Sequence, residues 1–274
     1  MVDAVTFYRP GRRFPAFSVT GGRCELQCDH CRGRFLAGMR PALTPRDLEA
    51  AARELAASGG TGLLLSGGCD ARGRVPLAPF LGTVLEIKRT TALAVNLHPG
   101  LVDREAAQAI MAAGADALSV DVLQDPATIR DVLHLGASPD DYRRTLELLA
   151  PSGRLVPHVC VGLQSEGAED RTLDLLSSFP LRSLVVLGLI SAPGAPRREV
   201  SSERLLGFVR RAVREVGAPV LLGCMRPRGR WQDEAAAIEA GVAGVVNPST
   251  RTVEWAASEG RHAAWREECC ALGP

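Results

Sequence analysis

Residues 16–31 read Ala16-Phe-Ser-Val-Thr20-Gly-Gly-Arg-Cys24-Glu-Leu-Gln-Cys28-Asp-His-Cys31. An apolar run of strand length, Ala16–Thr20, leads directly into three closely spaced cysteines. Thiolates are the ligands of iron–sulfur clusters, and a cubane cluster takes four of them. A tight loop that supplies only three leaves one iron open, as catalytic metal sites keep a position free for substrate. The spacing C-x3-C-x2-C therefore predicts a catalytic iron–sulfur site at the end of a strand.

Two other uses of closely spaced cysteines are less well supported. A zinc knuckle needs a second close Cys/His pair; His30 lies in the loop, but no distant C-x2-C or H-x3-H pair completes a set. A disulfide framework needs an oxidising compartment, and residues 1–13 contain no apolar core of a signal peptide. The iron–sulfur interpretation is preferred, with zinc as the main alternative.

Composition narrows the class of protein. The chain has 274 residues, 46% of them hydrophobic, which is enough for the core of one large domain. Its apolar runs, such as Leu181–Ile190, have the length of a strand rather than of a membrane span. We therefore expect a soluble, cytoplasmic protein with no membrane partner. The formal charge of +1, with acids and bases interspersed, indicates no nucleic-acid partner.

Short apolar runs alternate with amphipathic helical patterns along the whole chain. The predicted strands are Ala16–Thr20, Gly62–Ser66, Ala92–Leu97, Ala117–Val122, Leu155–Val161, Ser183–Ile190, Pro219–Gly223 and Gly241–Val246. Helical patterns such as Pro45–Ala57 and Ser202–Val216 follow capping residues. Strands and helices in this alternation predict an α/β fold, a single parallel (β/α)8 barrel of the TIM type, complete or nearly complete. A doubly wound open sheet is the alternative, weakened by the absence of a dinucleotide-binding fingerprint after the first strand.

No linker divides the chain, so one domain is expected. Residues 1–14 are predicted to form an N-terminal extension packed outside the first strand, and residues 15–260 to form the barrel. Residues 261–274 are predicted to form a tail whose Cys269-Cys270 pair folds over the barrel mouth.

Polar residues gather where the predicted strands end. They are the cysteine loop, Ser66-Gly67-Gly68-Cys69-Asp70, Asn96 and His98, Ser119 and Asp121, His158 and Cys160, Ser191 to Pro196, Cys224-Met225-Arg226 and Asn247-Pro-Ser249. A parallel barrel carries its chemistry at these ends, because the βα loops meet there. Burying so many polar groups is too costly for a purely structural barrel, so this end is the predicted active site.

The cysteine spacing and several strand-end segments resemble the radical S-adenosylmethionine (SAM) enzymes. In that family the open iron binds SAM, and an electron from the cluster cleaves SAM to a 5′-deoxyadenosyl radical. The resemblance implies a [4Fe–4S] cluster on Cys24, Cys28 and Cys31, SAM as a cofactor, and an electron donor of the ferredoxin or flavodoxin type. The implied cofactor-binding residues are His30 near the adenine, Ser66, Gly67 and Gly68 at the amino group, Ser119 or Asp121 at the ribose, Gly162 in the fifth-strand motif, and Asn96.

Two positions depart from the family pattern, and one further segment agrees with it. Cys69 stands where the family has a glutamate, and the usual acid of the fifth-strand motif falls on Ser165. Pro193-Gly194-Ala195-Pro196 is similar to the Pro-Gly-Thr-Pro turn of biotin synthase-like members.

Five cysteines lie outside the loop. Cys160 sits inside a predicted strand and suits the role of a small buried hydrophobe. Cys69 and Cys224 follow strand ends, and an adjacent Cys269-Cys270 pair in a polar tail has little packing rationale. We expect Cys69, Cys224 and one or both of Cys269 and Cys270 to hold a second [4Fe–4S] cluster, with inert or redox-sensing thiols as the alternative.

Segments spread over residues 18 to 272 resemble the archaeal-type, two-component lipoyl synthases. They are Ser18-Val-Thr-Gly-Gly-Arg-Cys24, Leu65-Ser-Gly-Gly-Cys69-Asp, Gly223-Cys-Met-Arg-Pro227, Val246-Asn-Pro-Ser249 and Cys269-Cys270-Ala-Leu272. The resemblance implies sulfur insertion into a protein-bound octanoyl chain, with a companion radical SAM subunit and a lipoyl carrier protein as partners. Two alternatives remain: radical SAM chemistry on another substrate, with the second cluster as an electron relay or anchor, and a non-catalytic iron–sulfur accessory protein.

Overall fold

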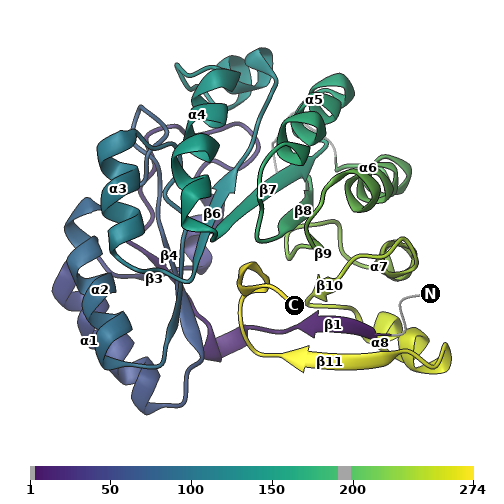
Figure 1. Ribbon diagram of the computed structural model, residues 1–274, viewed down its shortest axis with the longest axis horizontal. Helices are drawn as coiled ribbons and strands as arrows, with labels where there is room; N and C mark the ends of the chain where they lie inside the picture. Colours follow the sequence, from purple (N-terminus) through teal and green to yellow (C-terminus); the bar gives the residue numbers. More distant parts are fainter. Residues whose placement is uncertain (1–3, 191–198) are drawn as a thin grey trace.

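The computed structural model describes residues 4–190 and 199–274, and its strands form one curved, parallel sheet (Figure 1). The strands are β1 (Ala4–Tyr8), β2 (Ala16–Ser18), β3 (Arg40–Pro41), β4 (Gly62–Ser66), β5 (Ala94–Leu97), β6 (Ala117–Asp121), β7 (Leu155–Val161), β8 (Leu184–Gly188), β9 (Val220–Leu222), β10 (Gly244–Val246) and β11 (His262–Arg266). All eight predicted strands are confirmed, as β2 and β4 to β10. The predicted turn at Pro193-Gly194-Ala195-Pro196 lies outside the described residues.

The sheet is a parallel half-barrel. Its strand order is β11-β1-β10-β9-β8-β7-β6-β5-β4-β2-β3, and no pairing between its two ends is found in residues 4–190 and 199–274. Individual hydrogen bonds, rather than a strand ladder, link the two sides of this gap. The Thr61 N–H, just before β4, donates to the Arg13 carbonyl (2.8 Å), and the Thr61 hydroxyl donates to the Glu267 carbonyl, just after β11 (2.8 Å). Prolines 10 and 15 bracket the crossing segment, and proline cannot donate to a strand ladder. Closure into a complete (β/α)8 barrel is therefore not confirmed.

Helices cover the outer face of the sheet (Figure 1). The α-helices are α1 (Pro45–Ala57), α2 (Leu81–Thr90), α3 (Arg104–Ala112), α4 (Pro139–Leu149), α5 (Glu166–Ser177), α6 (Ser202–Glu215), α7 (Trp231–Glu239) and α8 (Thr250–Ser258). Helix α1 has the predicted bounds and begins with a capping box, in which Thr44 and Asp47 exchange side chain–backbone hydrogen bonds. Its buried residues Leu48, Ala52 and Leu55 lie on one face, which packs inward.

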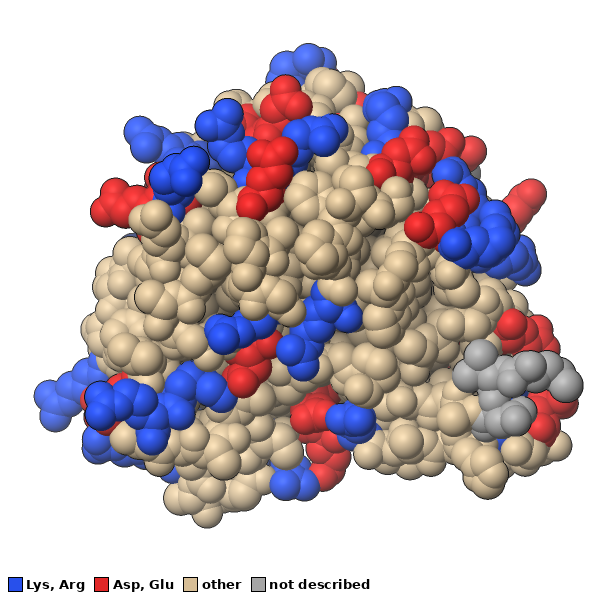
Figure 2. Space-filling model, viewed as in Figure 1, with Lys and Arg blue, Asp and Glu red and all other residues tan. Residues whose placement is uncertain are grey.

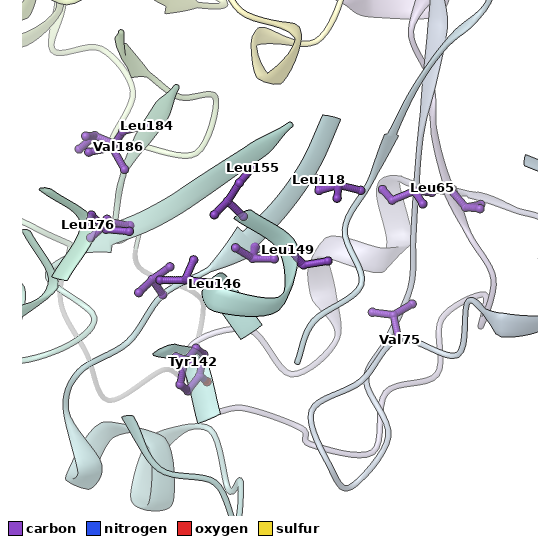
Figure 3. Close-up of a cluster of buried hydrophobic side chains, with 14 of the residues drawn as sticks. Leu65, Val75, Leu118, Tyr142, Leu146, Leu149, Leu155, Leu176, Leu184 and Val186 are labelled. Atoms are coloured by element: carbon purple, nitrogen blue, oxygen red, sulfur yellow. The ribbon is translucent and has the colours of Figure 1, made fainter. Parts of the chain in front are cut away.

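The hydrophobic core lies between the sheet and the helices. Figure 3 shows Leu118 of β6 and Leu155 of β7 near Leu146 and Leu149 of α4, all of them almost completely buried. Each such side chain contributes about 1.5–3 kcal/mol through removal from water. Because successive strand residues point to opposite faces, this apolar outer layer leaves the alternate positions of each strand to line the interior.

Both chain ends depart from the predicted domain boundaries. Ala4–Tyr8, expected outside the first strand, is strand β1 and lies between β10 and β11 in the sheet. Phe7 and Tyr8 are fully buried, which explains why this segment joins the sheet rather than packing outside it. His262–Arg266, expected in the tail, is strand β11 and extends the sheet beside β1 (Figure 1).

The C-terminal tail, predicted to fold over the barrel mouth, enters the interior of the sheet. The short 3₁₀ turn η6 (Cys270–Leu272) lies inside the curve of the sheet (Figure 1). Cys270 and Ala271 are buried in an inner apolar layer formed with Tyr8, Ala117, Val156, Val185, Leu187, Leu221 and Val246. Arg182, which precedes β8, donates from Nε to the Leu272 carbonyl (3.1 Å). The tail therefore fills the interior and reaches the start of β8, because its apolar residues find an apolar layer there.

The surface carries charges of both signs. Figure 2 shows Lys/Arg and Asp/Glu side chains interspersed on this face, with no large patch of one sign. This agrees with a formal net charge of +1. Among the described residues, no helix combines the length and the apolar character that crossing a membrane would require.

Candidate functional site

The three-cysteine loop follows β2 and is folded by its own backbone. The Cys31 and Arg32 N–H groups donate to the Cys28 carbonyl (2.9 and 2.8 Å), and the Gly33 N–H donates to the Cys31 sulfur (3.3 Å). Gln27 and Arg32 have φ values of 48° and 46°, in the left-handed region that non-glycine residues seldom adopt. The loop is therefore a tight turn that holds its cysteines in one place.

The charges on these thiols indicate what the loop can bind. Burial, and then negative charge on Cys31 and Cys24, raise the pKa of the Cys28 thiol to about 12. Burial likewise raises the pKa of Cys31. Cys28 and Cys31, whose pKa values are raised, become thiolates readily only where a cation compensates their charge. The irons of a cluster supply that positive charge, so this donor set fits the predicted [4Fe–4S] cluster.

Gly67 and Gly68, after β4, pack directly on the cysteine loop. A Cβ at Gly68 would lie 2.0 Å from the Arg23 carbonyl oxygen and 2.7 Å from Cys24 Cα. The Gly68 N–H donates to the Thr20 hydroxyl (2.7 Å). Only glycine fits such a close backbone approach, so the two loops form one unit.

Cys69 faces the same loop. Its carbonyl accepts a hydrogen bond from the Glu25 N–H (2.9 Å). Burial raises the pKa of its thiol to about 12, together with negative charge on Cys24 and Asp121. The cysteine that replaces the family's glutamate therefore lies beside the cluster loop.

Polar residues on the inner face of the sheet are hydrogen-bonded to one another. The Ser119 hydroxyl donates to Asn96 Oδ1 (3.0 Å), and both side chains are buried. Asn96 Nδ2 donates to the Cys269 sulfur (3.6 Å), and the Ser66 hydroxyl donates to the His98 carbonyl (3.0 Å). The Ser119 hydroxyl, one of the two predicted ribose contacts, is thus bonded to Asn96.

The inner face also carries three titratable residues that lie close together: His98, Asp121 and His158. His98 Nε2 lies 3.4 Å from Asp121 Oδ2. Burial opposes the charge of Asp121, yet positive charge and a hydrogen bond from His98 lower its pKa to about 2. Burial lowers the pKa of His98, but Asp121 more than offsets this and the pKa is raised overall. Burial, and then the charge of His98, lower the pKa of His158 to about 4.

All these groups line one cavity of about 900 Å³. Of the predicted residues, its walls include Cys24, Cys28, His30, Cys31, Ser66, Gly67, Gly68, Cys69, Asn96, Ser119, Asp121, Cys224, Cys269 and Cys270. His98, His158 and Cys160 line it as well, although none of them is among the predicted binding residues. The signal for them was strand alternation, since His158 and Cys160 are two residues apart on β7 and share its inner face.

Gly162 is a predicted cofactor-binding residue that does not line the cavity. Its N–H donates to Glu169 Oε1 (2.6 Å). A Cβ there would meet Val200 Cβ at 3.0 Å, and its φ is +92°. These contacts favour a structural role for Gly162 over the predicted cofactor contact.

The predicted four-cysteine set for a second cluster is divided. Cys69 packs with Cys24 against the main core, whereas Cys269 and Cys270 belong to the inner layer. A hydrogen bond with Cys269, burial, and negative charge on Cys269 and Cys224 raise the pKa of Cys270. Hydrogen bonds from Cys270 and Asn96 outweigh burial and lower the pKa of Cys269 to about 7. Cys224 therefore interacts electrostatically with Cys269 and Cys270, whereas Cys69 interacts with Cys24 and Cys28.

Fold and site together define an iron–sulfur enzyme built on a parallel half-barrel. Residues 18–176 match the family model of the radical SAM superfamily, which is more than half of the chain. The chain belongs to this superfamily. Membership implies a [4Fe–4S] cluster and the cleavage of SAM to a radical. No curated protein shows significant similarity to the chain.

Solved structures of low sequence identity share the fold. One is methylornithine synthase (PylB), with a TM-score of 0.67 and 16% identity, over 97% of this chain and 85% of that one. Another is the FeFe-hydrogenase maturase HydG from Carboxydothermus hydrogenoformans, with a TM-score of 0.66 and 13% identity, over 96% and 68%. Streptococcus suis SuiB bound to SAM has a TM-score of 0.57 and 14% identity, over 79% of this chain and 50% of SuiB.

Proposed function

We propose that this protein inserts sulfur into a protein-bound octanoyl chain, with a second iron–sulfur cluster as the sulfur source. The observation that carries the proposal is that two separate groups of thiols line one cavity. Cys24, Cys28 and Cys31 form the first group; Cys224, Cys269 and Cys270, whose thiols interact electrostatically, form the second. A radical generated at one group would then have a sulfur source at the other.

The first group would hold the SAM-binding cluster, and the backbone of Gly67 and Gly68 would receive the amino group of SAM. A cluster bound there supplies the electron that cleaves SAM, which gives a radical able to remove hydrogen from an unactivated C–H bond. The second group would hold the cluster that supplies sulfide. Alkyl C–H bonds offer no handle to an acid or base, so the chain needs no acid–base pair for this step.

The apolar part of the cavity wall suits an alkyl chain. Leu101, Leu133, Leu135, Leu163, Leu187 and Ile190 all line the cavity. Apolar walls bind an apolar chain and exclude water, which would otherwise compete with the substrate for space. Partners follow from the proposal: a ferredoxin- or flavodoxin-type electron donor, a companion radical SAM subunit and a lipoyl carrier protein.

A second candidate function is radical SAM chemistry on a polar substrate, with the second cluster as a relay or anchor. It is favoured by His98, Asp121 and His158, which place two imidazoles and a carboxylate in the same cavity. The alkyl carbons of an octanoyl chain, where sulfur would be inserted, have no group for them to bind.

The test is iron and sulfide content with Mössbauer spectra after anaerobic reconstitution. Wild type should bind about eight irons, and the variants Cys24/Cys28/Cys31→Ala and Cys224/Cys269/Cys270→Ala about four each. Cys69→Ala and Cys160→Ala are matched controls and should keep about eight. Incubation with SAM, a reductant and an octanoylated carrier peptide should then give a sulfur-containing product from wild type alone. About four irons in wild type, falling to none in the first triple variant, would contradict the proposal.

A further inference from the structure

Three side chains from neighbouring strands converge inside the cavity. His98 follows β5, Asp121 ends β6 and His158 lies in β7. Asp121 and His158 are direct partners in the β6–β7 register, so both point to the inner face. One ligand-type atom of each of the three residues can be chosen so that all lie within 4.8 Å of one another.

The separations suit a shared cation. His98 Nε2 and Asp121 Oδ2 are 3.4 Å apart, longer than the 2.7–3.2 Å of a well-formed N–H···O hydrogen bond, so their direct contact is weak. Two ligands of a tetrahedral zinc ion, each about 2.0–2.1 Å from the metal, lie about 3.3 Å apart. The observed distance therefore matches an edge of such a ligand set, and small side-chain movements would bring in the third ligand.

His158 supplies a second, independent observation. Its Nδ1 atom is buried and has no hydrogen-bond partner. A buried polar atom without a partner costs free energy, on the order of 1–3 kcal/mol, unless something satisfies it. The His98 and His158 ring centroids are 5.6 Å apart, so the two imidazoles flank one space.

We propose that His98, Asp121 and His158 bind one divalent cation of the Zn²⁺, Fe²⁺ or Mn²⁺ class. Two imidazoles and a carboxylate suit these metals and leave coordination positions open. The open positions face the cavity that the cluster loop also lines, so a carboxylate, hydroxyl or carbonyl oxygen of a substrate could bind there. This site contains no cysteine and does not depend on the proposed sulfur insertion.

The test uses Mn²⁺ alone as the probe, added to the reconstituted, oxidised protein without SAM. Mn²⁺ prefers nitrogen and oxygen ligands to thiolates, which keeps it from the cysteine groups. The six-line EPR signal of free Mn²⁺ counts the unbound ion. Wild type should bind one Mn²⁺ per chain, and His158→Leu should weaken its affinity by about tenfold or more. The matched control is His134→Leu, which breaks the partly exposed His134–Asp29 pair (3.1 Å) and should leave affinity unchanged.

A second measurement needs no variant. Pulsed EPR of Mn²⁺ bound to wild type should show coupling to imidazole nitrogen, so the proposal stays testable if His158→Leu loses its cluster absorbance through misfolding. Saturable binding with nitrogen coupling and sensitivity to His158 supports the site. Absence of saturable binding, absence of nitrogen coupling, or equal affinity in a folded His158→Leu protein would overturn it.

Discussion

The cysteine loop can pack as it does only because Gly68 has no Cβ atom. The Cβ of any other residue would overlap the Arg23 carbonyl oxygen and Cys24 Cα. These are backbone atoms, so no side-chain rotation relieves the clash. The backbone N–H of Gly68 is also bonded to Thr20, at the start of the cysteine loop. The position of Cys24 therefore depends on the absence of a side chain in a different loop.

We expect Gly68→Ala to displace Cys24 and to reduce iron incorporation at the first cluster by more than half. The measurement is iron content and cluster absorbance after reconstitution, followed by reductive SAM cleavage. Gly82→Ala is the control, because a Cβ at Gly82 in helix α2 meets nothing within 4 Å. That variant should bind iron normally and be more stable by up to about 1 kcal/mol. Equal iron content in both variants would contradict the close-packing argument.

Residue identity and spacing predict the cysteine loop because its three ligands lie close together in the sequence. The grouping of the other cysteines is not predictable in this way. Cys69 and Cys224 both follow strand ends, yet one lies beside the loop and the other with Cys269 and Cys270. A position at a strand end predicts the edge of the sheet at which a residue lies. It does not predict which residues lie opposite across the interior, because these depend on how far the sheet curves and where the tail inserts.

Among the elements, a buried ion pair ties the loop after β9 to helix α7. Arg226 Nη2 donates to Glu234 Oε1 of α7 (2.5 Å), and Arg226 Nη1 donates to the Val246 carbonyl at the end of β10 (2.8 Å). Glu234 Oε2 accepts from the Ser249 N–H, at the N-cap of α8 (2.8 Å). The pair thus anchors the segment that carries Cys224.

Replacing Glu234 with glutamine should destabilise the protein by about 3–5 kcal/mol, because a buried guanidinium loses its counter-charge. The side chains of Arg226 and Glu234 are 2% and 7% exposed. The control is Glu267→Gln, which breaks an ion pair with Arg13 whose side chains are 50% and 56% exposed. That change should cost no more than about 1 kcal/mol. Denaturant unfolding measures both, and similar losses in the two variants would contradict the prediction.

The same pair predicts a pH dependence. Burial alone would raise the pKa of Glu234, but Arg226, Thr252 and Ser249 together hold it below its ordinary value of 4.5. A lowered folded-state pKa gives stability that is fully present above pH 4.5 and is lost as pH falls through the folded-state pKa. The stability difference between wild type and Glu234→Gln should therefore be constant above pH 4.5 and shrink below it. Unfolding curves from pH 7 downward test this, and a difference that grows in acid would refute it.

Elements with a buried face are the ones that the sequence predicts. Strand β8 is buried along its whole length, and helix α1 carries a capping box and an apolar face, so both were recognisable from pattern. Strand β11 (His262–Arg266) is exposed at every position and shows no alternation, so nothing in its sequence marks it as a strand. It forms because β1 beside it offers an unpaired edge, which is a tertiary effect.

For the molecule as a whole, the C-terminal tail completes the interior that the half-barrel leaves open. Cys270 and Ala271 are buried against inner residues of β1 and of β6 to β10, and Leu272 is bonded to Arg182. The tail also brings Cys269 to Asn96, in the middle of the inner polar layer. One short segment therefore serves both the inner core and the second group of thiols.

These two roles can be separated by experiment. Removing residues 269–274 should expose Val185, Leu221 and Val246 to water and cost about 3–5 kcal/mol, on the scale of a large-to-small core substitution. The variant Cys269→Ser/Cys270→Ala keeps the tail in place, so it should lose only about 1 kcal/mol while losing any iron held by that group. Denaturant unfolding and the binding of a hydrophobic dye compare the two proteins. If truncation and double substitution gave equal stability and equal dye binding, the tail would contribute thiols but no core, and the half-barrel would be stable with its interior open.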